Sequence, residues 1–432
     1  MFLTSKRFWK WIGYSILALI VLVMIAYAGV TLWANFRLAP RLAALRASGE
    51  PTSISELAPK PVPAAEDGST YLAEIAPQVE AFAKDHVRFY DSPLGQSYDM
   101  KADYGLELSA EEIAAIRAIL DKYPSIEPAL RQATECKYYA SRLDYSLEFN
   151  PFLEAILDKA QDLRTCARML RWKSEVQLAE GNVAEAVQAG LLTLRLSRLQ
   201  EQEPAMVNGL VAVALRGLGI EMINRALRSG PIQEELRHSL DADLASYDEL
   251  DWYVHTLKTE RAYNLSSTDD LFPHFPVTWL GTLFKADIIG LYDKLLPLAA
   301  EPFYVSAEKI AAHQHDVYSI PISNSLIGLL FPAIDAAHVS ANRSLVDVRC
   351  LRILNALQAF REIHNVEAKA LNDLDLSKPA TIDPFTGEPL KLKLTDDGWV
   401  IYSVMKNVKD DGGNFDDQRD WGVAPIGYSG SD

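Results

Sequence analysis

The chain has 432 residues, of which 49% are hydrophobic, and its formal charge is −16. That hydrophobic content is typical of a folded protein and excludes a disordered chain. Six basic residues precede the first acidic residue, Glu50, so the remainder carries 36 Lys and Arg against 58 Asp and Glu, a formal charge of −22. An acidic body of this kind argues against nucleic acid and against anionic lipid as partners.

An uncharged stretch near the N-terminus is long enough to cross a membrane. Residues 11–36 contain no Asp, Glu, Lys or Arg, and a bilayer core needs about 20 apolar residues. Aromatic side chains at both ends suit the two membrane interfaces: Trp9, Trp11 and Tyr14 at one end, and Tyr27 and Trp33 at the other. We therefore expect a transmembrane helix over residues 11–36, preceded by a cytoplasmic tail over residues 1–10.

A cleaved signal peptide is the competing interpretation, because Ala26-Tyr27-Ala28 resembles an A-x-A cleavage site. Signal-peptide apolar regions usually run about 7–15 residues, whereas the apolar run up to Ala28 is 18 residues long, so we favour an uncleaved signal anchor. Basic residues flank the stretch on both sides and leave its direction ambiguous. A short tail before a long domain is the usual signal-anchor layout, which favours a body outside the cytoplasm.

A linker and a helical body follow the anchor. Residues 37–65 read as a linker because prolines become frequent, and helical periodicity then dominates residues 66–372. Ser109 and Glu112 form a capping-box signal for a helix through Leu120. Residues 168–179 and 183–199 predict a helix pair, and within it Ala179 to Leu196 fits half of a tetratricopeptide repeat. An array needs at least about three repeats, so we expect a non-repetitive body, with a degenerate solenoid as the alternative.

Two apolar segments of the body could be mistaken for membrane spans. Residues 206–227 contain three charges, so we interpret them as a central buried helix rather than a second span. Residues 317–334 are uncharged but contain two prolines, which favours a buried helix or the lining of a groove; contact with a membrane surface is the alternative. Residues 346–364 have the period of an amphipathic helix.

The chain changes character in its last sixty residues. Residues 390–394 alternate between apolar and polar side chains, Asp397-Gly398 is a turn signal, and residues 399–404 are aliphatic and aromatic. This pattern predicts a β-hairpin. The fold expected overall is mainly α, with an N-terminal transmembrane helix, a helical body and a small C-terminal β-hairpin module over residues 373–432.

Several motifs of this module carry a resemblance to a known family. They are Asp383-Pro384-Phe385 with Gly387, Tyr402-Ser403-Val404, Asp410-Asp411-Gly412-Gly413, Asp416-Asp417 and Asp420-Trp421. Over about fifty residues they resemble the C-terminal part of the major pseudopilin of type II secretion. The N-terminus lacks the prepilin processing site, so the chain is no pilin subunit. Where the family has Gly-Ala-Asp-Gly, this chain has Met405-Lys406-Asn407-Val408.

The pseudopilin resemblance implies a calcium-binding loop. The candidate ligands are Asp410, Asp411, Asn414, Asp416, Asp417 and Asp420. Ca²⁺ takes about six to eight oxygen ligands, and Asp and Asn side chains on a glycine-flexed loop can supply them. The spacing is not that of an EF-hand, and no Glu closes the loop. A solvated acidic turn is the alternative.

The rest of the chain resembles a family of membrane-anchored bacterial proteins to which no activity is attached. The shared features are Pro61-x-Pro63, Ala179-Glu180-Gly181-Asn182 with Ala186, and Gln202-Glu203-Pro204 before an apolar helix. This resemblance implies a single-pass protein of the bacterial inner (cytoplasmic) membrane, with its body on the periplasmic side.

The other residues that could carry chemistry do not define a site. His313 and His315 could ligate a metal from one face of a strand, but we favour a surface turn. Cys136 and Cys166 could form a bridge, although two buried thiols are favoured; Cys350 completes an odd count without a CxxC pair. The sequence contains no H-E-x-x-H, G-x-S-x-G or G-x-x-x-x-G-K motif.

Three functions remain open. We favour a non-enzymatic scaffold or partner-binding module of the cell envelope that binds a protein. The second is an accessory component of a type II secretion or pilus-like assembly, which rests on the tail resemblance alone. The third is an extracytoplasmic hydrolase without a recognisable motif.

Overall fold

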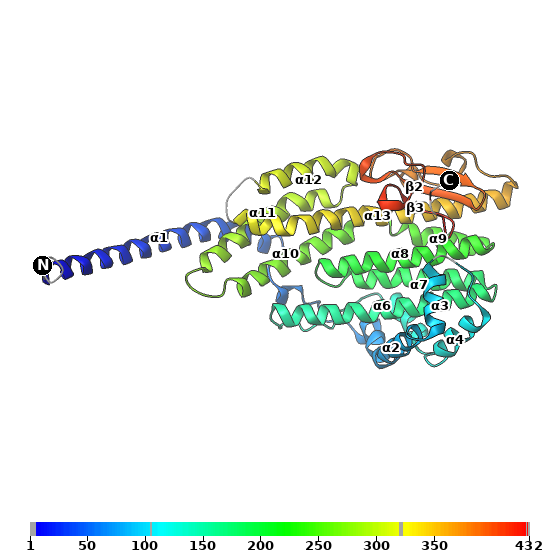
Figure 1. The fold of residues 1–432 in the computed structure, drawn as a ribbon, viewed down its shortest axis with the longest axis horizontal. Helices are drawn as coiled ribbons and strands as arrows, with labels where there is room; N and C mark the ends of the chain where they lie inside the picture. Colours follow the sequence, from blue (N-terminus) through cyan, green and yellow to red (C-terminus); the bar gives the residue numbers. More distant parts are fainter. Residues whose placement is uncertain (1–5, 104–105, 319–322, 429, 431–432) are drawn as a thin grey trace.

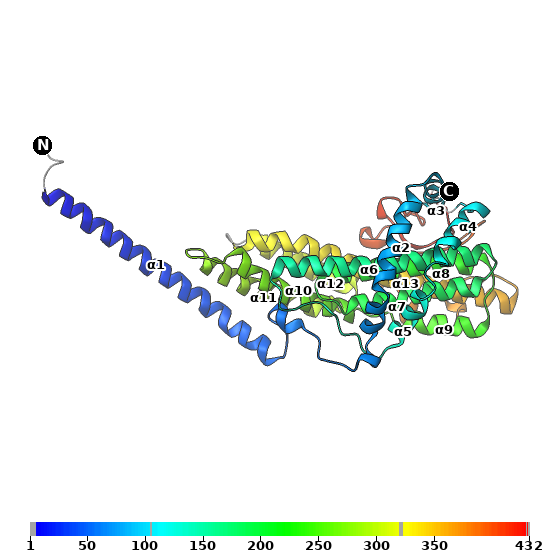
Figure 2. The same ribbon diagram turned by 90° about the horizontal axis from the view of Figure 1, so that it is seen from below.

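The computed structural model describes residues 6–103, 106–318, 323–428 and 430, with the side chains of 6–8, 103 and 313–331 left aside. A long N-terminal helix projects from a body of packed helices, and a small sheet lies at the far end of that body (Figures 1 and 2). This arrangement confirms the prediction of a mainly helical protein with an apolar N-terminal helix; it does not establish a solenoid.

The α-helices of the described residues are α1 (Lys6–Ala47), α2 (Gly68–Tyr90), α3 (Pro93–Asp103), α4 (Ala110–Leu120), α5 (Ile126–Glu135), α6 (Phe149–Ala179), α7 (Val183–Glu201), α8 (Met206–Ser229), α9 (Glu234–Ala245), α10 (Asp251–Leu271), α11 (Thr278–Ala299), α12 (Phe303–Tyr318) and α13 (Ser323–His364). The strands are β1 (Lys391–Thr395), β2 (Gly398–Ser403) and β3 (Trp421–Val423).

The N-terminal half of α1 is long and apolar enough to cross a membrane, and its most apolar stretch of 18 residues is not buried in the body. The helix does not end at Phe36, where we expected a linker to begin, but continues to Ala47. Leu38 and Leu45, which lie two turns apart on one face, are buried in a core shared with α10 and α11. Burial of this face explains why the segment is helical.

The apolar helix α8 lies inside the body, and more than half of its most apolar stretch of 18 residues is buried there. All four of its charged side chains have partners in the body. Arg216 donates to Ser344 (2.9 Å) and to Glu201, and Arg225 lies 3.6 Å from Glu175. Glu221 lies 3.6 Å from Arg171, and Arg228 donates to the Trp399 carbonyl oxygen at 2.7 Å. A helix whose charges pair with neighbouring helices is a core helix of the body, as the sequence analysis expected for residues 206–227.

The C-terminal segment forms an antiparallel sheet in the order β1-β2-β3. Thr395 pairs with Gly398 across the predicted turn, which confirms the hairpin, and β3 adds a third strand that the sequence analysis did not predict. Ile401 and Val423 are buried in the same core as Leu351 of α13. The sheet therefore packs directly onto the longest helix of the body (Figure 1).

Candidate functional site

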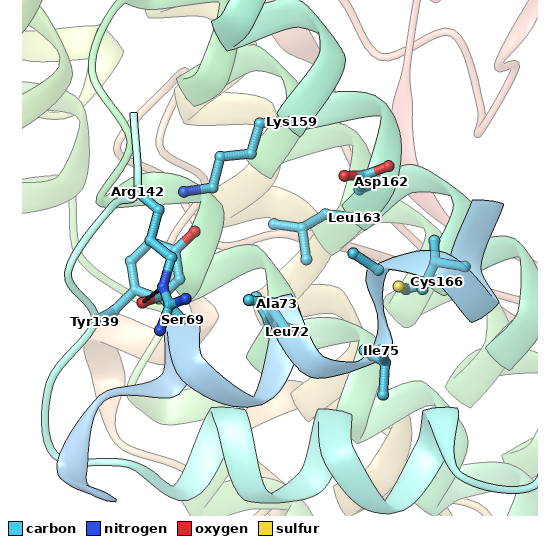
Figure 3. A pocket seen from close by; sticks show the side chains of 12 residues that line it. Ser69, Leu72, Ala73, Ile75, Tyr139, Arg142, Lys159, Asp162, Leu163 and Cys166 are labelled. Atoms are coloured by element: carbon cyan, nitrogen blue, oxygen red, sulfur yellow. Dashed lines mark hydrogen bonds between the residues drawn. The ribbon is translucent and has the colours of Figure 1, made fainter. Parts of the chain in front are cut away.

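A groove of about 190 Å³ lies between α2 and α6, with the segment that carries Tyr139 and Arg142 at one end (Figure 3). Its lining residues are Ser69, Leu72, Ala73, Ile75, Ala76, Val79, Tyr139, Arg142, Lys159, Asp162, Leu163 and Cys166. The floor is apolar, because Ile75, Val79 and Leu163 belong to the buried core beneath it. Small side chains at Ala73 and Ala76 leave the space open.

The start of α2 positions one end of the groove. Asp67 caps the helix: its carboxylate accepts from the Ser69 amide at 2.9 Å and from the Ala140 amide at 3.0 Å. Burial opposes ionisation of Asp67, but these hydrogen bonds hold its pKa below the usual value. A Cβ on Gly68 would lie 2.4 Å from the Ala133 carbonyl oxygen, so this close approach requires glycine. The segment that follows Ala140 is thereby tied to α2.

A buried carboxylate lies behind the same end of the groove. Glu203 is 1% exposed and accepts hydrogen bonds from Tyr139 Oη and Ser141 Oγ, both at 2.5 Å. Lys159 Nζ lies 2.6 Å from Glu203 and neutralises it. Burial also raises the pKa of Tyr139 well above its usual value, so the phenol stays a donor. Glu203 therefore fixes the side chains of both Tyr139 and Lys159.

Arg142 supplies an exposed positive charge at this end of the groove. Its Nε donates to Ser69 Oγ at 3.1 Å and its Nη2 to Thr70 Oγ1 at 3.0 Å, and both of these acceptors are neutral hydroxyls. The residue is exposed, and Lys159 reaches toward the same end in Figure 3. An acidic group at this end of the groove would meet a guanidinium held in place by hydroxyl groups.

The other end of the groove carries Asp162 and Cys166. Burial, together with the charge of Asp158, raises the pKa of Asp162. Burial raises the pKa of Cys166 to about 12, so its thiol stays protonated near neutral pH and is a poor nucleophile. These lining residues offer an apolar surface with fixed charges rather than an activated nucleophile, which suits binding better than covalent catalysis.

A second, more open recess of about 420 Å³ lies beside the C-terminal half of α2. His86 stacks on Trp172 with ring centroids 4.7 Å apart, and burial lowers the pKa of His86 to about 4, so the ring is neutral near pH 7. Arg171 lies at its edge but pairs with Glu175 (3.3 Å) and Glu221 (3.6 Å). The exposed Arg168 also lines the recess. The lining is mostly aromatic and charged and lacks the aliphatic floor of the groove, so this recess is a weaker candidate than the groove for an apolar segment.

The predicted calcium ligands do not converge. Asp410 accepts from Tyr402 Oη (2.9 Å) and the Gly412 amide (3.0 Å), and Asp411 pairs with Lys409 at 2.6 Å. Asn414 Oδ1 accepts from the Asp416 amide at 2.8 Å. Over the described part of the chain, no three His, Cys, Asp or Glu side chains are arranged to hold a metal ion.

Asp420 is the one member of this set that fits a ligand role. It is fully buried, its Oδ2 accepts from the Gly413 (2.8 Å) and Asn414 (3.2 Å) amides, and its Oδ1 has no hydrogen-bond partner. Asp417 sits in a short 3₁₀ turn with a left-handed backbone (φ 52°). Calcium binding would require the other carboxylates to leave their present partners, so the calcium loop stays a prediction.

The other tail motifs have a structural role in common. Asp383 is buried; its Oδ1 accepts from the Phe385 amide and Ser403 Oγ, both at 2.8 Å, and its Oδ2 accepts from the Val404 amide at 3.3 Å. Phe385 packs against Phe303 of α12 with ring centroids 4.9 Å apart. The two motifs therefore meet through Asp383 and close the turn that leads into the sheet.

The histidine and cysteine predictions have simple outcomes. The backbone of His313 and His315 lies in α12 rather than in a strand or turn, and their side chains lie outside the described residues. Cys136, Cys166 and Cys350 are free thiols, and the latter two are buried.

The groove draws its residues from three segments. None of its lining residues was predicted from the sequence to belong to a binding site. Of the two cysteines considered as a possible bridge, Cys136 and Cys166, only Cys166 lines the groove. One signal pointed nearby: the motif Gln202-Glu203-Pro204, whose Glu203 holds Tyr139 and Lys159. No family model, no curated protein and no solved structure matches this chain.

Proposed function

We propose that this chain is a single-pass, membrane-anchored protein of the bacterial cell envelope whose body binds a protein partner in the groove between α2 and α6. The observation that carries the proposal is a groove of about 190 Å³ with an apolar floor, beside the exposed guanidinium of Arg142, in a body of net charge −22. A local cation next to an apolar depression gives an otherwise acidic body a place that favours an acidic, apolar segment.

The chemistry of the partner follows from the groove. An apolar side chain would fill the space over Ala73 and Ala76, and a carboxylate close to it would reach Arg142. A short segment of a protein offers both groups. With the N-terminus in the cytoplasm, the body and its groove would face the periplasm, where such a segment would belong to another envelope protein.

Site-specific photo-cross-linking in cells that produce the full chain tests this proposal. A photoreactive residue at Ala76, which lines the groove, is expected to give a defined adduct, whereas the same residue at the exposed His238 of α9 is expected to give none. Ala73→Trp fills the groove and should abolish the adduct. Glu74→Trp, at an exposed position next to it that does not line the groove, should leave the adduct unchanged.

Equal adducts from Ala76 and His238, or an adduct that survives Ala73→Trp, would refute binding in the groove. The identity of a groove-dependent adduct also separates the functions: a pseudopilin would favour the accessory role in a secretion or pilus-like assembly that the tail motifs suggest. A hydrolase at this groove is disfavoured, because the Cys166 thiol stays protonated and Lys159 is neutralised by Glu203.

A further inference from the structure

The turn between α10 and α11 is an exposed apolar tip. Leu271 is 63% exposed, Phe275 is 75% exposed and Val277 is 38% exposed. No Asp, Glu, Lys or Arg occurs from residue 271 to residue 284. Large apolar side chains that are exposed side by side on an acidic protein indicate a contact surface rather than a solvated turn.

The charged residues stop where the tip begins. Asp269, two residues before Leu271, is 73% exposed and pairs with Lys285 of α11 at 2.6 Å. Asp270 is also exposed. The α10–α11 pair therefore carries charged residues, Asp269, Asp270 and Lys285, beside an uncharged apolar end.

The apolar tip lies against the uncharged part of α1. Phe275 packs edge-on against Tyr27 with ring centroids 4.9 Å apart, and Tyr27 Oη lies 3.0 Å from Thr278 Oγ1. Both ribbon views place the α10–α11 turn at the end of the body from which the N-terminal half of α1 projects (Figures 1 and 2). The tip and the proposed membrane span are thus neighbours.

The position of Tyr27 along α1 gives the depth of the tip. With a rise of about 1.5 Å per residue, Tyr27 lies about 24 Å beyond Trp11. A hydrocarbon core about 30 Å thick that begins at Trp11 would end about four residues after Tyr27. Higher along α1, Arg37 pairs with Asp287 of α11 at 2.7 Å, which keeps α11 upright beside the helix. Phe275 would then lie about 6 Å inside the outer boundary of the core.

We propose that the α10–α11 tip, with Leu271, Phe275 and Val277, inserts into the outer boundary of the bilayer beside α1 and forms a second membrane contact. This inference rests on the proposed span of α1. The rings and aliphatic side chains would lie at the level where apolar groups leave water, and the Asp269–Lys285 pair would stay above it.

A bilayer suits this tip better than a second copy of the chain. Three exposed apolar side chains form a small surface, whereas a stable dimer buries roughly 1,600 Å² in total. Lipid must already surround α1 at Tyr27 if α1 spans the membrane, so the neighbouring Phe275 meets lipid without further rearrangement. Because the tip contains no Asp, Glu, Lys or Arg, its contact with the bilayer should depend little on anionic lipid or on salt at pH 8.

Depth-dependent fluorescence quenching tests the proposal on the full chain in phosphatidylcholine vesicles. Cys136→Ser removes the one partly exposed cysteine. Single cysteines at Phe275, at Leu22 of α1 and at His238 of α9 then receive an environment-sensitive dye. Lipids with a quencher close to the headgroup should quench the dye at Phe275 severalfold more than the dye at His238, and quenchers deep in the core should quench the dye at Leu22.

The outcomes separate the two proposals. Quenching at Leu22 without quenching at Phe275 would overturn the membrane contact and leave the anchor intact. Absence of quenching at both positions would overturn the anchor and this inference with it. A dye at Phe275 that is shielded from water yet unquenched would indicate protein contact and overturn the inference. As a further check, a dye at Leu271→Cys should lose its shallow quenching with Phe275→Asp and keep it with Phe275→Leu.

Discussion

Replacing Gly219 with alanine should destabilise the body, because α7 and α8 cross there at backbone distance. A Cβ on Gly219 would lie 2.9 Å from the carbonyl oxygen of Gly190, 2.9 Å from Leu194 Cγ and 3.1 Å from the Leu194 amide nitrogen. Leu194 is fully buried and cannot swing into solvent. The added methyl group therefore forces the two helix backbones apart.

Two opposing effects set the magnitude of this change. Alanine is favoured over glycine in a helix interior by about 1 kcal/mol. Overpacking of a tight core site costs about 1–3 kcal/mol, and the upper part of that range applies here because one of the close atoms belongs to a backbone carbonyl. We expect Gly219→Ala to lower the free energy of unfolding by about 1–2 kcal/mol, the difference of the two effects.

The same helix supplies a matched control. A Cβ on Gly217, two residues away in α8, would meet no atom within 4 Å. Gly217→Ala should therefore gain only the helix preference and raise stability by about 0.5–1 kcal/mol. Both substitutions replace glycine with alanine in α8, so they share any effect on the unfolded chain.

Thermal and denaturant unfolding of the full chain in one detergent, followed by tryptophan fluorescence and circular dichroism, measures the difference. The expected order of stability is Gly217→Ala above wild type and Gly219→Ala below it, with melting temperatures a few degrees apart. Equal stability of the two variants, or a more stable Gly219→Ala protein, would show that α7 and α8 do not cross at these glycines and would refute the reasoning.

Three further predictions concern buried charges and metal. Burial raises the pKa of Asp347 to about 7, although Trp421 Nε1 donates a hydrogen bond to it at 2.7 Å. Between pH 4 and 7 the folded state therefore binds one proton more than the unfolded state, and its stability falls as pH rises through that range. Asp347→Asn should raise stability at pH 8 by at most about 4 kcal/mol and by nothing at pH 4; a gain independent of pH would contradict this. Glu203→Ala leaves Lys159 without its partner and should lower the free energy of unfolding by about 2–4 kcal/mol. As a control, Glu180→Ala at the more exposed pair with Arg117 should lower it by less than about 1 kcal/mol. Equal losses in the two variants would contradict the buried role of Glu203. Calcium at about 5 mM should stabilise the full chain by about 1 kcal/mol if the Asp-rich loop binds with a Kd near 1 mM, and Asp420→Asn should remove the effect; an unchanged melting temperature would refute the calcium loop.

Local signals in the sequence predicted local structure well. The capping box forms: Ser109 Oγ accepts from the Glu112 amide at 3.3 Å, and Glu112 accepts from the Ser109 amide at 2.6 Å. The Asp397-Gly398 signal gives the predicted hairpin turn. In both cases, the residues that make the contact lie only a few positions apart in the chain, so the sequence pattern itself specifies the contact. The short strand β3 lacks such a signal, because its three residues gain their place only by pairing with β2.

The groove could not be predicted in this way, because contacts between distant segments create it. Asp67 meets Ala140, and Glu203 meets Lys159, across separations of 73 and 44 residues. Each residue alone fits an ordinary acidic helical protein. Only the packing of α2 against α6 places the apolar floor beside Arg142, and no spacing rule encodes that packing.

The prolines after residue 36 led us to expect a linker from residue 37, whereas α1 continues to Ala47. Pro40 removes one helical hydrogen bond, yet α1 continues through it because Leu38 and Leu45 are buried against α10 and α11. Arg37 pairs with Asp287, and Arg41 donates to the Ala286 carbonyl oxygen. A body joined to the proposed anchor by a packed helix cannot swing as it would on a flexible tether. The direction of the groove relative to the proposed membrane is therefore set by the α1–α11 contact, and a partner in that groove would have to approach from that direction.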